Sequence, residues 1–120
     1  MGDRIVYSIK QADGLSLNLY SHWGGSGRFA DLANALKAAE PRWDDESYAA
    51  RIIISNLINS GWDSETGFGL WASNEEGTCY GGDHQDITID IPNKIVNDET
   101  GAHTFEQFIS FHGFVAAATS

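Results

Sequence analysis

The fold is decided by residues Arg4–Tyr20, whose sequence is RIVYSIKQADGLSLNLY. Arg4–Lys10 is rich in β-branched and aromatic residues, which favour β-strands. Leu15–Tyr20 alternates apolar and polar side chains, the period of a strand with one buried face. Between these segments, the dipeptide Asp13-Gly14 tolerates the positive φ angles of a tight turn. The stretch therefore predicts an antiparallel β-hairpin.

Helices are expected after this hairpin and near the end of the chain, because apolar residues recur there three and four residues apart. Ser26 is positioned to cap the first helix, and Pro41 is positioned to stop it. Thr104 and Gln107 have the spacing of a capping box. The predicted helices cover Arg28–Glu40, the segment from Asp44 or Asp45 to about Asn59, and a short segment after Thr104 that includes Phe105, Phe108 and Ile109.

Two further strands are expected over Gly67–Ala72 and Asp86–Ile91. The second alternates isoleucine with polar residues, which predicts a half-buried antiparallel strand, and Lys94–Asn97 continues it as a short edge segment. The order ββααββα predicts one α+β domain over residues 1–120, with an antiparallel sheet of about four strands, helices on one face and a weakly ordered tail at about 113–120. The expected core contains Leu17, Leu19, Leu36, Ile53, Leu57, Ile87 and Ile89.

The composition is that of a globular, acidic protein of 120 residues, with a formal net charge of -10 and a pI near 4.5. Such a charge disfavours direct binding to nucleic acids and to anionic membrane surfaces. Met1–Lys10 has no long apolar run, so neither a signal peptide nor a membrane span is expected. The single cysteine, Cys79, is typical of a reducing, cytoplasmic setting. Loops and helix ends are expected to carry the acidic residues Asp44, Asp45, Glu75, Glu76, Asp98 and Glu99.

The most informative segment for function lies between the second strand and the first helix. Glycines in such a loop let backbone N–H groups converge, and the start of a helix adds positive potential, so the segment is a candidate anion site. Arg28 supplies a cation for a phosphate or carboxylate. The alternative is a tight connection in which the glycines only relieve crowding and His22 caps a carbonyl. The candidate ligand-binding residues here are Tyr20, His22, Trp23, Gly24, Gly25, Ser26, Gly27 and Arg28.

Arg42 and Trp43 form a second candidate, because together they present a cation and a stacking surface. The alternative is a corner between two helices in which Trp43 fills the core. The acidic residues that follow suit the first turn of an ordinary helix.

No catalytic constellation is recognisable, and no metal or cofactor is expected. His84 lies near two carboxylates in sequence, but the other histidines are far from it along the chain. Cys79 has no basic neighbour in sequence that would lower its pKa. A phosphodiesterase that uses His22, with His84 as its partner, remains a further hypothesis.

Three segments, Leu19–Gly25 (LYSHWGG), Pro41–Asp45 (PRWDD) and Gly67–Gly69 (GFG), together resemble a family of small, uncharacterised proteins of tailed bacteriophages. The resemblance implies a phage accessory protein that acts in the cytoplasm of the bacterial host. It assigns no catalytic residues. It favours a protein that counters host defence, either by trapping a nucleotide signal or by occupying a host protein.

The leading hypothesis is therefore a protein that binds an anionic, nucleotide-like small molecule, such as an immune signalling nucleotide of the host. The alternative is an acidic inhibitor, or DNA mimic, that binds a host protein. The high content of apolar residues is also compatible with a homo-oligomer. Neither hypothesis requires a membrane or direct contact with nucleic acid.

Overall fold

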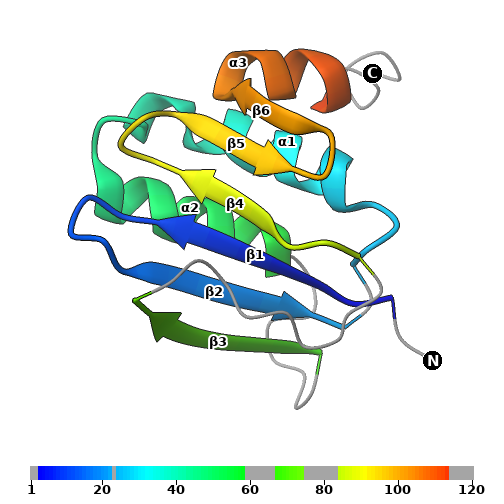
Figure 1. Ribbon diagram of the computed structural model, residues 1–120. Helices are drawn as coiled ribbons and strands as arrows, with labels where there is room; N and C mark the ends of the chain where they lie inside the picture. Colours follow the sequence, from blue (N-terminus) through cyan, green and yellow to red (C-terminus); the bar gives the residue numbers. More distant parts are fainter. Residues whose placement is uncertain (1–2, 23, 59–66, 75–83, 114–120) are drawn as a thin grey trace.

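The computed structural model describes residues 3–22, 24–58, 67–74 and 84–113. They form a six-stranded sheet in the order β3-β2-β1-β4-β5-β6, with helices packed against it (Figure 1). The strands are β1 (Ile5–Lys10), β2 (Ser16–Ser21), β3 (Phe68–Ser73), β4 (Ile87–Asp90), β5 (Ile95–Asp98) and β6 (Gly101–Thr104). The helices are α1 (Arg28–Ala39), α2 (Glu46–Ile58) and α3 (Phe105–Phe108), with a 3₁₀ turn at Glu40–Arg42 and a final π-helical turn at Ile109–Gly113.

The predicted hairpin is confirmed. Strands β1 and β2 pair antiparallel from Ile5↔Ser21 to Lys10↔Ser16. Gly14 has a φ of 89°, a conformation that favours glycine, and the Leu15 N–H donates to Asp13 Oδ1 at 3.0 Å. Asp13 and Gly14 thus build the turn that joins the two strands.

The sheet is mixed, so the prediction of about four antiparallel strands is wrong. Strand β4 pairs parallel to β1 through Tyr7↔Ile87 and Ile9↔Ile89. Strand β5 is an inner strand, not an edge segment, because β6 pairs with its far side. The alternation in Asp86–Ile91 shows that one face of β4 is buried, but it carries no information on the direction of the neighbouring strand.

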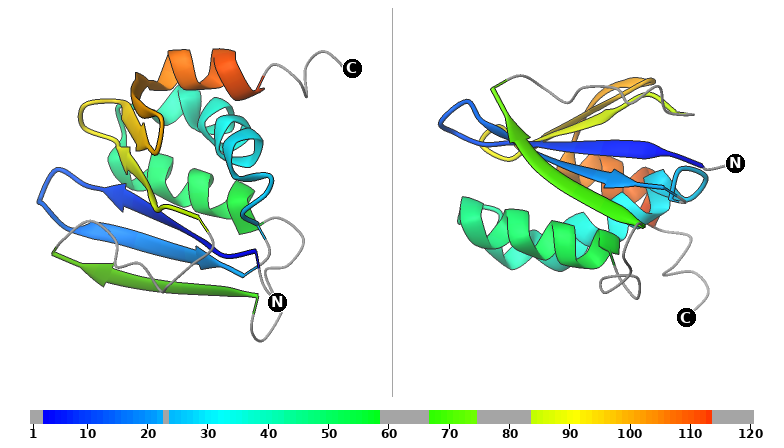
Figure 2. Two further views of the ribbon diagram at one scale, coloured as in Figure 1. Left: turned by 45° about the vertical axis from the view of Figure 1, so that its right-hand side comes forward. Right: turned by 90° about the horizontal axis from the view of Figure 1, so that it is seen from below.

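The helices lie on one face of the sheet, as the sequence predicts (Figure 2). The predicted first helix is confirmed, but the cap assigned to Ser26 is wrong. The N-cap residue is Gly27, without a side-chain hydrogen bond, because the Ser26 hydroxyl donates to Asp3 instead. The predicted capping box is present, since the Gln107 N–H donates to Thr104 Oγ1 and the Thr104 N–H to Gln107 Oε1, each at 3.0 Å. The expected helix stop after Asn59 lies outside the described residues.

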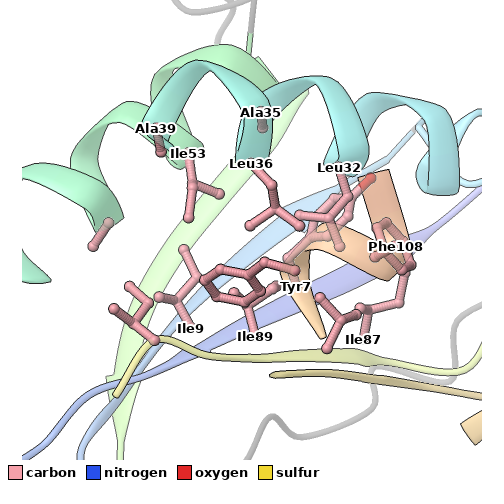
Figure 3. Packing of buried hydrophobic residues seen from close by; sticks show 14 of the residues in the cluster. Tyr7, Ile9, Leu32, Ala35, Leu36, Ala39, Ile53, Ile87, Ile89 and Phe108 are labelled. Atoms are coloured by element: carbon pink, nitrogen blue, oxygen red, sulfur yellow. The ribbon is translucent and has the colours of Figure 1, made fainter. Parts of the chain in front are cut away.

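The core lies between the helices and the sheet, where Leu32 and Leu36 of α1 face Tyr7, Ile9 and Ile89 (Figure 3). Burial of this apolar face is the main term that stabilises the fold. The radius of gyration of 13.2 Å is that of one compact domain. Of the predicted core residues, five are fully buried, namely Leu19, Leu36, Ile53, Ile87 and Ile89, and two are partly buried, namely Leu17 and Leu57.

One acidic residue departs from the surface placement that its sequence position predicts. Asp98 ends β5, and its side chain is 1% exposed. Its Oδ1 accepts hydrogen bonds from the Thr100 N–H at 2.7 Å and from the Thr100 hydroxyl, so it shapes the β5–β6 turn. Glu99 lies exposed in that turn, Asp44 and Asp45 precede α2, and Glu75 and Glu76 lie outside the described residues.

The face of the sheet opposite the helices carries a buried polar row. The Ser8 hydroxyl donates to Asn18 Oδ1 at 2.7 Å, and Asn18 Nδ2 donates to Ser73 Oγ at 2.9 Å. Ser8 and Asn18 are both 0% exposed, so this row fixes the register of β1, β2 and β3 in the interior. We call this side of the sheet the outer face.

Candidate ligand-binding site

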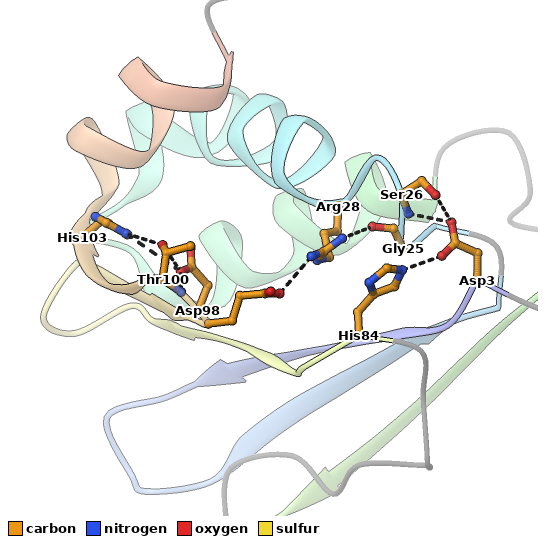
Figure 4. Close-up of polar contacts among 9 residues, drawn as sticks. Asp3, Gly25, Ser26, Arg28, His84, Asp98, Thr100 and His103 are labelled. Atoms are coloured by element: carbon orange, nitrogen blue, oxygen red, sulfur yellow. Dashed lines mark hydrogen bonds and ion pairs between the residues drawn. The ribbon is translucent and has the colours of Figure 1, made fainter.

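The glycine-rich loop joins β2 to α1, and it contacts the carboxylate of Asp3 (Figure 4). The Ser26 N–H donates to Asp3 Oδ2 at 2.6 Å, and the Ser26 hydroxyl donates to the same oxygen. His84 Nε2 lies 2.5 Å from Asp3 Oδ1. The hydrogen bond from the Ser26 hydroxyl, followed by that from His84, lowers the pKa of Asp3 from its usual 3.8 to about 2. The anion bound by this loop is therefore the chain's own carboxylate.

Gly25 is required by the close approach of these groups. Its N–H donates to the Asp3 carbonyl at 2.7 Å. A Cβ at this position would lie 2.1 Å from His84 Cδ2 and 2.6 Å from Asp3 Oδ1. A Cβ at Gly24 would lie 2.5 Å from Ser21 Oγ, whereas one at Gly27 would meet only the Asp31 carboxylate, at 3.3 Å. Asp3, Gly25, Ser26 and His84 together are called the Asp3 clasp below.

The side chain of Arg28 is held within the protein. Its Nη1 donates to the Gly25 carbonyl at 2.7 Å, and its Nη2 pairs with Glu99 Oε1 at 2.8 Å (Figure 4). The guanidinium also lies over the Phe29 ring, 4.4 Å from its centroid, and the side chain is 12% exposed. Arg28 thus ties the start of α1 to the β5–β6 turn.

The second candidate pair lies at the other end of α1. Trp43 Nε1 donates to the Leu36 carbonyl at 3.0 Å, and its ring packs edge-on against Phe105 at 5.1 Å. The exposed Arg42 lies over the Tyr48 ring, 5.2 Å from its centroid. A 12-residue helix spans roughly 18 Å, so the structure does not bring Arg42 and Trp43 to the glycine-rich loop.

Tyr20 and His22 contact each other at the end of β2. The Tyr20 hydroxyl lies 2.6 Å from His22 Nδ1, and the two rings meet edge-on with centroids 6.0 Å apart. Trp23 lies outside the described residues. Of the predicted binding residues that the structure describes, Tyr20 is the one that lines the cavity described next.

A cavity of about 510 Å³ opens beside Tyr20, lined by Arg4, Gly69, Leu70 and Trp71 as well. The register explains its composition, since Tyr20 pairs with Gly69 in the neighbouring strand. Leu19 pairs with Leu70 and points to the core. Because successive side chains of a strand alternate between the two faces, Tyr20, Gly69 and Trp71 project from the outer face. Two other hollows lined by described residues are smaller, at about 280 and 290 Å³.

Gly69 leaves the floor of this cavity open. A Cβ at this position would lie 3.7 Å from Tyr20 Cβ, an ordinary van der Waals contact. The residue is therefore compatible with a side chain, unlike Gly25. Among the described residues, the cavity combines one guanidinium with two aromatic side chains, a chemistry suited to an anionic ligand that carries a ring.

The Asp3 clasp does not have the arrangement of a serine hydrolase. In such an enzyme the histidine bridges the serine and the carboxylate, whereas here Asp3 bridges Ser26 and His84. Within the described ranges, no group of three or more histidine, cysteine, aspartate or glutamate residues is placed to hold a metal ion. No helix of the described part of the chain is long and apolar enough to cross a membrane.

Sequence reasoning missed Arg4, Gly69 and Trp71 as possible site residues. The available signal was the Gly-x-Trp spacing in a predicted strand, which places both residues on one face. The strand register, which the sequence does not reveal, is what brings Gly69 to Tyr20.

The fold and cavity define a small α+β protein with a mixed sheet and an aromatic-lined hollow on its outer face. Comparison of the chain with protein-family models, curated proteins and solved structures gives no match. Its function is therefore inferred from its own residues.

Proposed function

We propose that the protein binds an anionic, nucleotide-like small molecule in the cavity lined by Arg4, Tyr20, Gly69 and Trp71. The observation that carries the proposal is the placement of a guanidinium beside two aromatic side chains around about 510 Å³ of space. Small-molecule sites commonly have volumes of roughly 300–1,000 Å³. The cavity is therefore large enough to enclose a mononucleotide-sized ligand in part.

Each lining residue has a distinct role in this proposal. Arg4 pairs with the phosphate, while Tyr20 and Trp71 contact the base. Gly69 leaves room for the ring between them. Because the chain carries a net charge of -10, a distant anion is repelled, and the local guanidinium has to supply the attraction.

Binding without conversion fits a protein that sequesters its ligand. Taken with the resemblance to phage proteins, the proposal is that the ligand is a signalling nucleotide of the host and that the protein acts in the host cytoplasm. The glycine-rich loop supports the site indirectly, by holding the end of β2 and the start of α1 around Asp3.

The test is a thermal-shift screen with linear and cyclic nucleotides, followed by calorimetric titration of any nucleotide that raises the melting temperature. A ligand at 100 times its Kd stabilises the folded state by about 2.7 kcal/mol. Chromatography of the ligand after incubation should recover it unchanged. Recovery of a hydrolysed product would instead support the phosphodiesterase hypothesis.

The matched variants are Gly69→Val, which puts a branched side chain into the cavity next to Tyr20, and Leu15→Val, which alters an exposed side chain before β2. Gly69→Val should abolish the thermal shift, whereas Leu15→Val should retain it. A screen in which no nucleotide stabilises the wild-type protein would overturn the proposal and favour the acidic inhibitor of a host protein.

A further inference from the structure

Strand β3 forms one edge of the sheet. It pairs with β2 on one side, and no described strand pairs with it on the other. Its sequence, FGLWAS, contains no charged residue and no proline, although one residue in five of the whole chain is charged. Leu70 at its centre is 61% exposed. An apolar edge strand of this kind is a template for pairing with another strand, and natural proteins usually protect such edges with charge, proline or short length.

The opposite edge of the sheet has that protection. Strand β6 is four residues long and begins at Gly101, whose φ of 126° disfavours other residues. It passes directly into α3. The contrast identifies β3 as the edge that is suited to pairing.

The side chains of β3 alternate between the two faces of the sheet. Phe68, Leu70 and Ala72 lie on the helix face, and Gly69, Trp71 and Ser73 lie on the outer face. In a continuous antiparallel sheet, residues directly opposite each other share a face. Two copies of β3 related by a two-fold axis can therefore pair with either Leu70 or Trp71 on the axis.

We propose that two copies of this chain associate through antiparallel pairing of their β3 strands, with Leu70 opposite Leu70 of the second copy. This register places each Gly69 opposite Trp71 of the other copy, and each Phe68 opposite Ala72. Large side chains thus face small ones in every pair that is off the axis. The alternative register places Trp71 against Trp71 and leaves Gly69 opposite Ser73, so its side-chain volumes are less complementary.

This volume pattern favours a second copy over an unrelated peptide as the occupant, because the strand is complementary to itself. The absence of charge within FGLWAS also matters for a chain of net charge -10, since two copies can approach there without opposing charged side chains on the paired strands. The exposure of Leu70 shows that its helix-face side chain is left largely uncovered at this edge.

The first experiment is light scattering after size exclusion, on the ligand-free protein over a dilution series. The wild-type chain should have twice the 13.1 kDa mass of one copy and should dissociate on dilution. Leu70→Lys places two ammonium groups at the axis, and Ala72→Lys places one opposite each Phe68, so both variants should remain monomeric. Leu15→Lys, which changes another exposed leucine, should still dimerise. A monomeric wild-type protein, or dimers of both β3 variants, would overturn the proposal.

The second experiment tests the register. Opposed residues in antiparallel strands have Cα atoms about 4.5 or 5.5 Å apart, within the range that a disulfide spans. Leu70→Cys in a Cys79→Ser background should therefore form a covalent dimer on mild oxidation, and Leu15→Cys in that background should not. A non-covalent dimer in which Leu70→Cys fails to cross-link would overturn the stated register.

This interaction goes beyond the proposed ligand binding, and it is measured without a ligand because the pairing sets Trp71 of the second copy beside Gly69 of the cavity. The salt dependence of dimer formation also distinguishes it from ligand binding. Added salt screens the repulsion between two acidic copies and should increase the dimer fraction, whereas it should weaken an ion pair between Arg4 and a phosphate. A dimer that dissociates on addition of salt would contradict pairing through an uncharged strand.

Discussion

The glycine-rich loop and the outer-face cavity both adjoin the end of β2, but they differ in the space that they leave for a ligand. In the loop, the Ser26 N–H donates to an anion, but that anion is the carboxylate of Asp3 of the same chain. In the cavity, Arg4 and two aromatic residues surround about 510 Å³. The loop is easier to recognise in the sequence, whereas the cavity offers volume for a ligand.

A glycine motif therefore has to be interpreted together with the rest of the chain. Gly25 is needed because His84 and Asp3 approach its backbone, whereas a Cβ at Gly69 would meet Tyr20 at an ordinary van der Waals distance. A glycine that relieves internal crowding contributes to stability. A glycine whose missing side chain leaves a hollow is compatible with ligand binding.

The largest expected effect separates these two glycines. Gly25→Val should lower the free energy of unfolding by about 1–3 kcal/mol, because its Cβ would overlap His84 and Asp3. Gly69→Ala should leave stability unchanged or slightly raised, since its backbone and surroundings accept a methyl group. Urea denaturation of the two variants and the wild type measures both. Equal stability of Gly25→Val and the wild type would contradict the described packing of the Asp3 clasp.

An effect of similar size is expected on ligand affinity from the aromatic side chains that line the cavity. Loss of stacking on one aromatic residue costs about 1–3 kcal/mol per base, so Tyr20→Ala should weaken nucleotide binding by roughly five- to a hundredfold. Tyr20→Phe keeps the ring and removes the hydroxyl that contacts His22, so it should bind nearly as well as the wild type. Calorimetric titration compares the three proteins. Equal losses in the two variants would assign the effect to the hydroxyl and not to stacking.

The smallest effect is a pH dependence of the Asp3 clasp. Because the folded pKa of Asp3 is lowered to about 2, its carboxylate contributes stability that is present above about pH 4 and lost as the pH falls towards 2. The stability difference between the wild type and Asp3→Asn should therefore shrink over that window. Asp31 and Asp86, whose pKa values are raised by burial, act in the opposite direction but are common to both proteins.

Urea unfolding between pH 2 and pH 6 measures this difference. A difference between the wild type and Asp3→Asn that persists unchanged at pH 2 would show that the charge of Asp3 is not what holds the loop.

Local patterns predicted much of the fold. The hairpin, α1 and the capping box at Thr104 depend on residues near one another in sequence, and all three are confirmed. The parallel pairing of β4 with β1 could not be predicted in this way, because Ile87 and Ile89 alternate in the same manner beside either kind of neighbour. Strand β6 was missed because its sequence, GAHT, is short and contains little β-branched or aromatic content.

The candidate site was less accessible to sequence reasoning than the fold. Arg4, Tyr20 and Gly69 come from three separated segments, and only the pairing of β2 with β3 brings Tyr20 and Gly69 together. The glycine-rich loop was conspicuous in sequence because its residues are consecutive. Its binding partner, Asp3, was not conspicuous, because a single aspartate before the first strand has no signature.

We propose that the ligand binds in the cavity on the outer face and not in the glycine-rich loop. Calorimetric titration of Arg4→Ala and Arg28→Ala, with a nucleotide that stabilises the wild type, tests it most directly. Arg4→Ala should weaken binding by about 1.5–3 kcal/mol, roughly ten- to a hundredfold, because it removes a charged hydrogen bond to the phosphate. Arg28→Ala should leave the affinity within about twofold, since its guanidinium is engaged by Gly25 and Glu99. Unchanged binding by Arg4→Ala together with a large loss in Arg28→Ala would contradict the claim and return the site to the loop.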